Sequence, residues 1–398
     1  MSHVMSTSTA LIAGWARSAV APLGGAFGAL QAHEIAAPVI QALLKRAGIG
    51  PEAVDAVVVG NALGAGGNPA RLVVVAAGGP DACAACSIDT QCCSGLDAGS
   101  RAVGLIASGQ ASVIIAGGVE AWSRSPIRQH RPLRKGDTAV AYERPAFAPD
   151  PARDPDMLAS AARYAAAQGW TRVAQDAYAV QSHERALAHQ ALLDDAIVSE
   201  IISINGLTHD PYPRRISGAL ASRMPAVARQ KESECEEAES PNCSLSALSI
   251  SAKADAAGFV LLASPEACRA LGLKPKAAWI ASTSVGCPPE TPLLAAEAAT
   301  RAVLSRAGLT SADTLAVIEL HDAFAVQGLS FCQALQIDPL RVNRGGGGLA
   351  RGHPIGASAA IALVRLLAEL SHEKPSSFGL TAVAGAGGLG AAVIVQRL

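Results

Sequence analysis

Residues 42–61 read Ala42-Leu-Leu-Lys-Arg-Ala-Gly-Ile-Gly-Pro-Glu-Ala-Val-Asp-Ala-Val-Val-Val-Gly-Asn61, and residues 302–321 read Ala302-Val-Leu-Ser-Arg-Ala-Gly-Leu-Thr-Ser-Ala-Asp-Thr-Leu-Ala-Val-Ile-Glu-Leu-His321. In both stretches an apolar pattern of helical spacing ends at Arg-Ala-Gly, and a short apolar strand-like run follows. A helix that ends in Arg-Ala-Gly is common and is weak evidence for a repeat by itself. The agreement over helix, turn and strand predicts a chain built from two similar α/β halves.

A cysteine and a histidine occupy matching places in these two halves. Cys92-Cys-Ser-Gly-Leu96 and His353-Pro-Ile-Gly-Ala357 each open an apolar helical pattern. Pseudo-symmetry between the halves would bring both helix N-termini into one cleft. The positive end of a helix dipole favours thiolate over thiol, which would make Cys92 a strong nucleophile. The alternative is that Cys92 is a small buried apolar residue, as free cysteine often is.

The order of elements predicts a mostly parallel sheet with helices on both faces. Strands are expected at 10–14, 54–59 and 112–118, and helices at 33–48, within 64–80, and from Cys92 to Gly109. Strands that alternate with helices are typical of this architecture.

The composition changes near Trp122. Residues 123–155 contain many Arg and Pro, helical patterns follow at 157–168 and 172–191, and residues 205–247 are polar, with an acidic run from Glu232 to Glu239. Regular alternation resumes near Leu248. We therefore predict an inserted loop domain, since long excursions between core strands often carry binding functions. The predicted division is an N-terminal half in 1–122 completed by 248–272, the insertion in 123–247, and a C-terminal half in 273–398.

Composition narrows the class of protein. The chain has 398 residues, is 50% hydrophobic and carries a net charge of −1, so nothing indicates a nucleic-acid partner. No apolar run reaches the ~20 residues of a membrane span, and the first residues show no signal-peptide pattern. The nine cysteines are an odd number in a long chain, which indicates a reducing cytoplasm. Cys83, Cys86, Cys92 and Cys93 lack the spacing of a zinc site.

Several motifs resemble those of the thiolase superfamily, over nearly the whole chain. They are Ala26-Phe27 with His33-Glu34, Asn68–Arg71, Cys92-Cys-Ser-Gly-Leu96, Ala116-Gly-Gly-Val-Glu120, Asp154–Met157, Ser182–Arg185, His321-Asp-Ala-Phe324, Val342-Asn343, Gly352-His-Pro-Ile-Gly-Ala-Ser358 and Gly387-Gly-Leu-Gly390. The resemblance implies an α/β thiolase fold: two pseudo-symmetric βαβαβαββ halves in five layers (αβαβα), with an inserted loop domain. It also implies acyl chemistry on coenzyme A thioesters, with no permanently bound cofactor and no metal.

The resemblance assigns roles to residues that the motifs match. Cys92 would take the acyl group, His353 would accept the thiol proton, and the backbone of Ala386 would contact the oxyanion. His321 stands where many thiolases have asparagine, as in proteins that resemble the sterol-carrier-protein thiolases, and it would contact the thioester oxygen. Alternatives remain open: His353 could be a helix-terminal histidine satisfied by backbone, and His321 a buried strand-end histidine.

Substrate contacts are less clear from the sequence. The resemblance places pantetheine beside Ser251 and the acyl group near Met157, where the following residue is Leu158 in place of a small one. Arg215, with Arg214 and Arg223, could bind the phosphates of coenzyme A. The alternative for these arginines is an ordinary solvated basic surface.

One departure from the family pattern concerns proton transfer at the α-carbon. Thiolases usually place a second cysteine before the final glycine cluster or within the His-Asp-Cys-Phe motif, and this chain has Ala384 and Ala323 at those positions. Cys93 is a replacement in sequence only, because neighbouring helical residues point in different directions. The acyl-transfer half-reaction is expected to be intact, whereas the enolate half-reaction lacks its usual acid–base group.

The sequence thus predicts an acyl-CoA C-acyltransferase with Claisen-type condensation or cleavage of 3-ketoacyl-CoA. Two alternatives stand beside it: a condensing enzyme with a decarboxylating donor or nucleophilic acceptor, and a catalytically reduced protein that binds coenzyme A thioesters. The resemblance further implies a homodimer or homotetramer, and the cysteine count places the protein in the cytoplasm. No membrane partner is expected.

Overall fold

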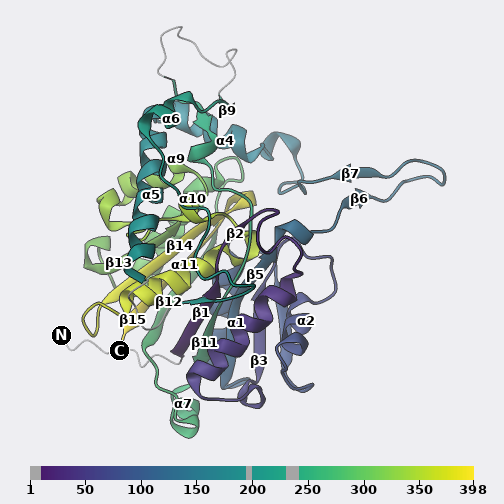
Figure 1. Ribbon diagram of the computed structural model, residues 1–398, viewed down its shortest axis with the longest axis vertical. Coiled ribbons are helices and arrows are strands. Elements are labelled where there is room, and N and C mark those ends of the chain that lie inside the picture. The colour runs from purple at the N-terminus through teal and green to yellow at the C-terminus, as the bar shows by residue number, and fades with distance from the viewer. Residues whose placement is uncertain (1–9, 194–199, 230–241) are drawn as a thin grey trace.

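The computed structural model describes residues 10–193, 200–229 and 242–398 of the chain. The N-terminal half contains most of the predicted elements (Figure 1). Its strands are β1 (Leu11–Ser18), β2 (Ala21–Pro22), β3 (Ala56–Gly60), β4 (Ala84–Ile88), β5 (Val113–Ala121) and β11 (Ala254–Ala263). Its helices are α1 (Ala32–Ala47), α2 (Pro69–Ala76), α3 (Ser94–Ala107) and α7 (Pro265–Leu271). Gly48 ends α1 in the left-handed conformation, as the sequence predicts.

The C-terminal half repeats this order with one reduction. It contains β12 (Ala277–Gly286), α8 (Ala295–Arg306), β13 (Leu315–His321), α9 (Ala325–Leu335), α10 (Gly348–Arg351), α11 (Ile355–Leu370), β14 (Phe378–Gly385) and β15 (Leu389–Arg397). Where the first half has β4, the second has only an isolated parallel bridge between Ile318 and Val342. Pro339 lacks a backbone N–H and Asn343 has φ 52°, and both features prevent a longer strand there.

The strands join in one sheet in the order β13-β14-β15-β12-β1-β11-β5-β3-β4. Within the described residues, the two half-sheets join at β1 and β12, where Leu11 pairs with Ala278 and Ile12 with Ala277. Away from this seam the two half-sheets face each other across α3 and α11. The prediction of a mostly parallel sheet is wrong. The pairs β3–β4, β3–β5 and β13–β14 are parallel, whereas β1–β11, β1–β12, β5–β11, β12–β15 and β14–β15 are antiparallel, because β11 and β15 return beside their neighbours without a crossover helix.

Three hydrophobic cores separate the helix and sheet layers, and their positions show that the molecule has five layers. One lies between α1 and α2 and the outer face of the first half-sheet, and it includes Val57 and Val59. The middle core surrounds α3 and α11 between the two half-sheets and includes Val58. The third packs α8 and α9 on the outer face of the second half-sheet. Successive strand residues point to opposite faces, so β3 contributes to two cores. This is the predicted αβαβα order.

The segment between β5 and β11 forms the upper part of the molecule in Figure 1. It contains β6 (Arg128–His130), β7 (Val140–Tyr142), α4 (Met157–Ala167), α5 (Arg172–Leu193), β8 (Ile201–Ile202), α6 (Gly218–Arg223), β9 (Ala226–Ala228) and β10 (Leu245–Ser246). The division of the chain at residues 122 and 247 stays a prediction, and the acidic run Glu232–Glu239 lies outside the described residues.

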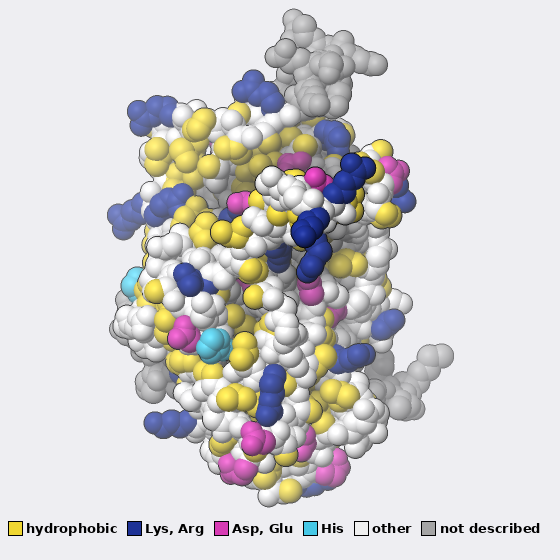
Figure 2. All heavy atoms as spheres, turned by 90° about the vertical axis from the view of Figure 1, so that its right-hand side faces the viewer, with side chains coloured by type: hydrophobic (Ala, Val, Ile, Leu, Met, Phe, Trp, Pro, Cys, Tyr) yellow, Lys and Arg dark blue, Asp and Glu magenta, His cyan; other side chains and the backbone are white. Residues whose placement is uncertain are grey.

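Residues 123–155, which contain many Arg and Pro, include an antiparallel hairpin of β6 and β7 that projects from the body. The face that carries this hairpin shows Lys and Arg side chains over its whole height, and several Asp and Glu side chains gather at its lower end (Figure 2). Ile127, Leu133 and Val140 of the hairpin region are exposed.

Candidate active site

Cys92 lies in a tight turn that ends directly before α3. Gln91 has φ 57°, and Cys93 is the N-cap of the helix. The hydroxyl of Ser94 fixes the turn, because it donates to the carbonyl of Gln91 at 2.6 Å and accepts from the N–H of Thr90 at 2.9 Å. The turn therefore holds the Cys92 sulfur at the N-terminal end of α3, as the sequence predicts.

His353 lies at the corresponding end of α11. Gly352 precedes it with φ 120°, a conformation that other residues rarely adopt. The backbone N–H of His353 donates to the carbonyl of Ala252 at 2.7 Å, which ties the turn to the segment before β11. Pro354 then caps the helix. The histidine position is thus fixed by backbone on both sides.

The structure brings the predicted cysteine and histidines together. The sulfur of Cys92 lies 3.2 Å from Nε2 of His353. On the other side of that ring, Nδ1 lies 2.5 Å from Nε2 of His321 and 2.9 Å from the hydroxyl of Ser358. The two imidazole rings stack with their centroids 4.7 Å apart. A continuous polar chain therefore runs from Cys92 through His353 to the end of β13.

Glycines allow the two half-sheets to approach each other around this chain. A Cβ atom on Gly95 of α3 would lie 2.6 Å from the backbone nitrogen of Ala360 in α11. A Cβ atom on Gly118 would lie 2.1 Å from the carbonyl oxygen of Gly356. Side chains at these positions would push α11 away, so the glycines set the distance between the cysteine and the histidine.

The expectation of a resting thiolate at Cys92 is wrong for this geometry. Burial raises the pKa of Cys92 to about 12, although the backbone N–H groups of Ala386 and Cys92 itself pull it down. Cys92 precedes the N-cap, and desolvation outweighs the favourable helix terminus. Burial also lowers the pKa of His353 to about 4 and that of His321 well below its ordinary value. All three groups are neutral at pH 7, so the thiol proton has to move during the reaction.

The same evidence places Ala386 beside the sulfur. Its backbone N–H and that of Cys92 both face the Cys92 sulfur closely enough to stabilise a negative charge there. Both N–H groups therefore favour the thiolate form of Cys92, although burial outweighs them.

The two alanines at the usual second-cysteine positions belong to different apolar clusters, Ala384 on the outer side of the second half-sheet and Ala323 beside α4. Ala384 is on β14 and Ala323 follows β13. The Cys93 sulfur lies 3.9 Å from the carbonyl of Val383 and would be 3.2 Å from a Cβ atom on Gly385. Alternate strand residues share a face, so Cys93 packs on the opposite face of β14 from the Ala384 methyl group. It is also buried, and burial raises its thiol pKa well above the ordinary value.

Two of the three predicted substrate contacts lie next to the cluster. Ser251 donates from its hydroxyl to the carbonyl of Gly348 at 2.6 Å and from its backbone N–H to the carbonyl of Ala323 at 2.9 Å. Met157 begins α4 and packs in the same apolar cluster as Ala323, beside Leu158. Both therefore border the loop that follows His321.

The predicted arginines are placed differently. Arg215 is exposed between α5 and α6, and among the described residues no hydrogen bond or ion pair links it to the cysteine–histidine cluster. Arg214 stacks on the Tyr212 ring at 4.4 Å, and Arg223 donates to the carbonyl of Ala219. Arg215 is thus free to meet a ligand at the surface, whereas its neighbours already have partners within the protein.

Two residues next to the site escaped the sequence reasoning. Ser358 closes the Gly352–Ser358 motif and contacts His353. Glu120 is buried and accepts hydrogen bonds from the backbone N–H groups of Ala62 and Gly356, both at 3.0 Å. It thereby ties the loop after β3 to the start of α11. Both residues belong to quoted motifs, but a motif alone does not say which side chain faces which partner.

Other kinds of site find no support in the described part of the chain. Within residues 10–193, 200–229 and 242–398, no three His, Cys, Asp or Glu side chains are grouped to hold a metal ion. Over the same residues, each helix is too short or too polar to cross a membrane.

Comparisons with known proteins agree with this geometry. The family models for the thiolase N-terminal domain and the thiolase C-terminal domain match residues 10–229 and 273–397. An acetyl-CoA acetyltransferase of Allochromatium vinosum is 34% identical, with 96% of this chain and 97% of the relative covered. An acetyl-CoA acetyltransferase of Cupriavidus necator is 33% identical, with 96% and 98% covered.

Solved structures give the same result. The Acat5 thiolase of Ascaris suum, in complex with coenzyme A, superimposes with a TM-score of 0.85 at 26% identity over 98% of this chain and 100% of that one. The acetyl-CoA acetyltransferase of Bacillus anthracis superimposes with a TM-score of 0.86 at 28% identity, covering 98% and 99%. The paired helix termini, the cysteine and histidine between them and these matches agree: the chain belongs to the thiolase family of acyltransferases.

Proposed function

We propose that this protein transfers acyl groups from coenzyme A thioesters through an acyl-enzyme on Cys92. The observation that carries the proposal is the 3.2 Å contact between the Cys92 sulfur and Nε2 of His353. A nucleophile within hydrogen-bond distance of a base, with the base held by a third group, is the arrangement expected for covalent catalysis.

The acylation step follows from the neutral resting state. Cys92 attacks the thioester carbon while its proton passes to Nε2 of His353. The backbone N–H groups of Ala386 and Cys92 hold the oxyanion. When the intermediate collapses, the departing thiolate takes the proton from His353, so the histidine ends neutral again. His321 orients His353 from the opposite side of the ring and can share the transient positive charge.

Coenzyme A thioesters are the substrate class that the relatives support. Curated relatives are named acetyl-CoA acetyltransferases, and the Ascaris suum thiolase was crystallised with coenzyme A. In this chain we assign the pantetheine arm to the surroundings of Ser251 and the acyl group to the neighbourhood of Met157. Arg215 is assigned to the phosphates because it is a surface cation with no described partner in the protein. No permanently bound cofactor enters this scheme.

A second candidate function rests on Ala384 and Ala323. Without a cysteine at either position, this site has no assigned acid–base group for the α-carbon of a second acyl-CoA. A decarboxylating donor or an acceptor that is already nucleophilic would need no such group. The chain would then be a condensing enzyme that shares only the acylation step with thiolases. A protein that binds thioesters without turnover is the remaining alternative.

The cellular setting is part of the same proposal. We place the protein in the cytoplasm, because its cysteines, eight of which are described, form no disulfide among themselves. We also expect a homodimer or homotetramer.

Intact-mass spectrometry after incubation with a panel of acyl-CoAs tests the proposal. The expected result is an adduct of one acyl group that maps to the Cys92 peptide. Cys92→Ala should lose the adduct and Cys93→Ala should keep it. An adduct on Cys93, or an undiminished adduct in Cys92→Ala, would contradict the assignment. A protein that binds an acyl-CoA without forming any adduct would support the non-catalytic alternative.

A further inference from the structure

A small cavity lies between the end of β13 and the start of α11, behind the histidine pair. Glu319 and His321 line it from β13, Arg351 from α10, and Ser358 and Ala362 from α11. The region of this cavity in which the centre of a water molecule fits has a volume of about 10 Å³. That is roughly the space that one buried water occupies, and a buried water also needs two to four polar partners. This cavity is lined by such partners.

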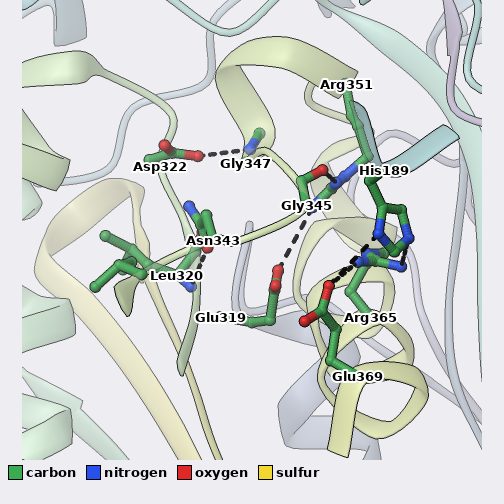
Figure 3. A network of polar contacts seen from close by, with 12 residues as sticks. His189, Glu319, Leu320, Asp322, Asn343, Gly345, Gly347, Arg351, Arg365 and Glu369 are labelled. Atoms are coloured by element: carbon green, nitrogen blue, oxygen red, sulfur yellow. Dashed lines mark hydrogen bonds and ion pairs between the residues drawn. The ribbon is translucent and has the colours of Figure 1, made fainter. Parts of the chain in front are cut away.

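Glu319 presents an oxygen without a partner beside this cavity. Glu319 and His321 are two residues apart on β13, so both point to the α11 side of the strand. The Glu319 side chain is 1% exposed, and its Oε2 lies 3.4 Å from the guanidinium of Arg351 (Figure 3). Its Oε1 has no hydrogen-bond partner among the described residues. A buried carboxylate oxygen left in this way is costly, which points to a donor within the cavity.

The chemistry of the cysteine fixes where the protons lie on the two histidines. Nε2 of His353 has to carry a lone pair to take the Cys92 proton, so its Nδ1 carries hydrogen. That N–H faces Nε2 of His321 at 2.5 Å, so the His321 hydrogen is on Nδ1. This Nδ1 packs against Gly348, where an added Cβ atom would come within 2.9 Å of it. Gly348 and His321 both line the cavity, so a donor is available there.

We propose that a water in this cavity links Nδ1 of His321 to Oε1 of Glu319, and that the Glu319 carboxylate stabilises the positive charge that the histidine pair acquires from Cys92. Glu319 is a positioning residue, because it acts through His321 and His353 and touches no substrate. The proton moves from the Cys92 sulfur to Nε2 of His353, and the Nδ1 proton of His353 is shared with His321. The carboxylate takes up no proton, so His353 can still protonate the leaving thiolate.

The charged surroundings decide when Glu319 can act. Burial raises the pKa of Glu319 to about 8, against the pull of Arg351 and Arg365 and with the repulsion of Glu369 and Glu200. His321 faces His353 and Arg351. Because the pKa is raised, the carboxylate is mostly protonated below about pH 8 and charged above it. The stabilising effect therefore has to grow as the pH rises through this range.

Alkylation of Cys92 by iodoacetamide tests this inference without acyl-CoA, so its outcome is distinct from that of the proposed function on which it rests. The rate at the Cys92 peptide is followed by mass spectrometry for wild type and Glu319→Gln from pH 6 to 9.5. We expect the ratio of wild-type to variant rate to rise from near one to roughly tenfold, the scale of a charge-assisted hydrogen bond. Loss of the thiol proton to bulk solvent raises both rates with pH, so the ratio reports the part of the activation that depends on Glu319.

Glu369→Gln is the matched control. Glu369 is a carboxylate of the same buried group, bound to Arg365 at 2.6 Å, and it does not line the cavity. Its rate ratio should not rise with pH, because loss of the Glu369 charge makes Glu319 easier to ionise and the variant is at least as fast as the wild type. A ratio for Glu319→Gln that does not change with pH, or the same change in Glu369→Gln, would overturn the proposal.

A cavity-filling variant tests the water link separately and decides the matter if Glu319→Gln does not fold. In Ala362→Val two added methyl groups occupy the cavity while Glu319 remains. The pH-dependent gain in alkylation rate should then be lost, with the thermal unfolding midpoint showing that the fold persists. Wild-type pH dependence in a folded Ala362→Val protein would rule out the water link.

Discussion

Cys92 and His353 face each other as a neutral thiol and a neutral imidazole, although the helix N-terminus beside Cys92 would favour a thiolate. Both groups are buried, and desolvation penalises each charge separately. A neutral thiol is a weak nucleophile, so the pair reacts little until a bound thioester carbonyl accepts the electron pair of the sulfur. The site therefore links thiol activation to substrate binding.

Replacement of His353 should separate its role as a base from a purely structural one. His353→Ala is expected to slow acylation of Cys92 by roughly 10²–10⁴-fold, the usual contribution of a general base. Wild-type acylation should remain nearly level from pH 7 down to pH 5.5, because the pKa of His353 is lowered to about 4 and the rise caused by Glu319 is centred near pH 8. An ordinary histidine with a pKa of ~6.5 would lose about tenfold over that range.

Stopped-flow acylation at several pH values measures both effects. His372→Ala changes an exposed histidine and is the control. An inflection near pH 6.5 in the wild type would show that burial does not lower the His353 pKa as stated.

Ala384 should limit the enolate half of the reaction. Thiolysis of a 3-ketoacyl-CoA requires a proton at the α-carbon, and an acid–base group there contributes roughly two to four orders of magnitude. We expect weak thiolysis of acetoacetyl-CoA in the wild type and an increase in Ala384→Cys, while acylation of Cys92 stays unchanged. Steady-state thiolysis beside single-turnover acylation checks this. Wild-type turnover near the ~10 s⁻¹ median of enzymes would mean that another residue moves the proton.

At the scale of elements, the site depends on how closely α3 approaches α11. The two helices come from different halves, and each delivers one reactive group at its N-terminus. Gly95 allows the contact, because a Cβ atom there would lie 2.6 Å from the Ala360 backbone and 2.8 Å from its Cβ. The distance between sulfur and imidazole is therefore a property of helix packing as much as of the two side chains.

Gly95→Ala should widen this contact. We expect a loss of about 1–3 kcal/mol in the free energy of unfolding, the usual cost of overpacking, and slower alkylation and acylation of Cys92. Gly104→Ala is the matched control on the same helix, because nothing lies within 4 Å of an added Cβ atom there. It should leave the chemistry unchanged and raise stability by up to about 1 kcal/mol. Denaturant unfolding and Cys92 labelling rates measure the two effects, and equal behaviour of the variants would contradict the packing argument.

At the scale of the whole molecule, the sequence predicts the duplicated α/β halves and the proximity of Cys92 to His353. Both predictions rest on apolar periodicity and motif position, which reflect helices, strands and their order along the chain directly. Three features required the structure. The protonation state of Cys92 depends on how deeply its sulfur is buried, which cannot be read from apolar periodicity. The link from Glu120 to Gly356 and the cavity beside Glu319 join segments far apart in the chain. The β6–β7 hairpin is too short to produce a clear strand pattern between its Arg and Pro residues.

The outer end of the N-terminal half combines an open strand edge with exposed apolar side chains. β4 closes the strand order and pairs only with β3 among the described strands, so its other edge is open. The neighbouring helix α2 exposes Leu72 and Val75, at 56% and 58%. An open strand edge next to an apolar helix face is a surface that a second copy of the chain could cover, in a two-fold arrangement where each copy uses the same patch.

We therefore expect a dimer that forms through β4 and α2. Light scattering should give a mass of roughly 80 kDa, twice the 40.2 kDa of one chain. Leu72→Lys places a charge in the proposed interface and should shift the protein toward the monomer, with its thermal unfolding midpoint falling as the protein is diluted. Leu340→Lys changes a similarly exposed leucine, at 60%, far along the sheet order from β4, and should leave the mass unchanged. A wild-type monomer at micromolar concentration would contradict the dimer. A dimer that survives Leu72→Lys and breaks in Leu340→Lys would place the contact on the opposite half of the molecule.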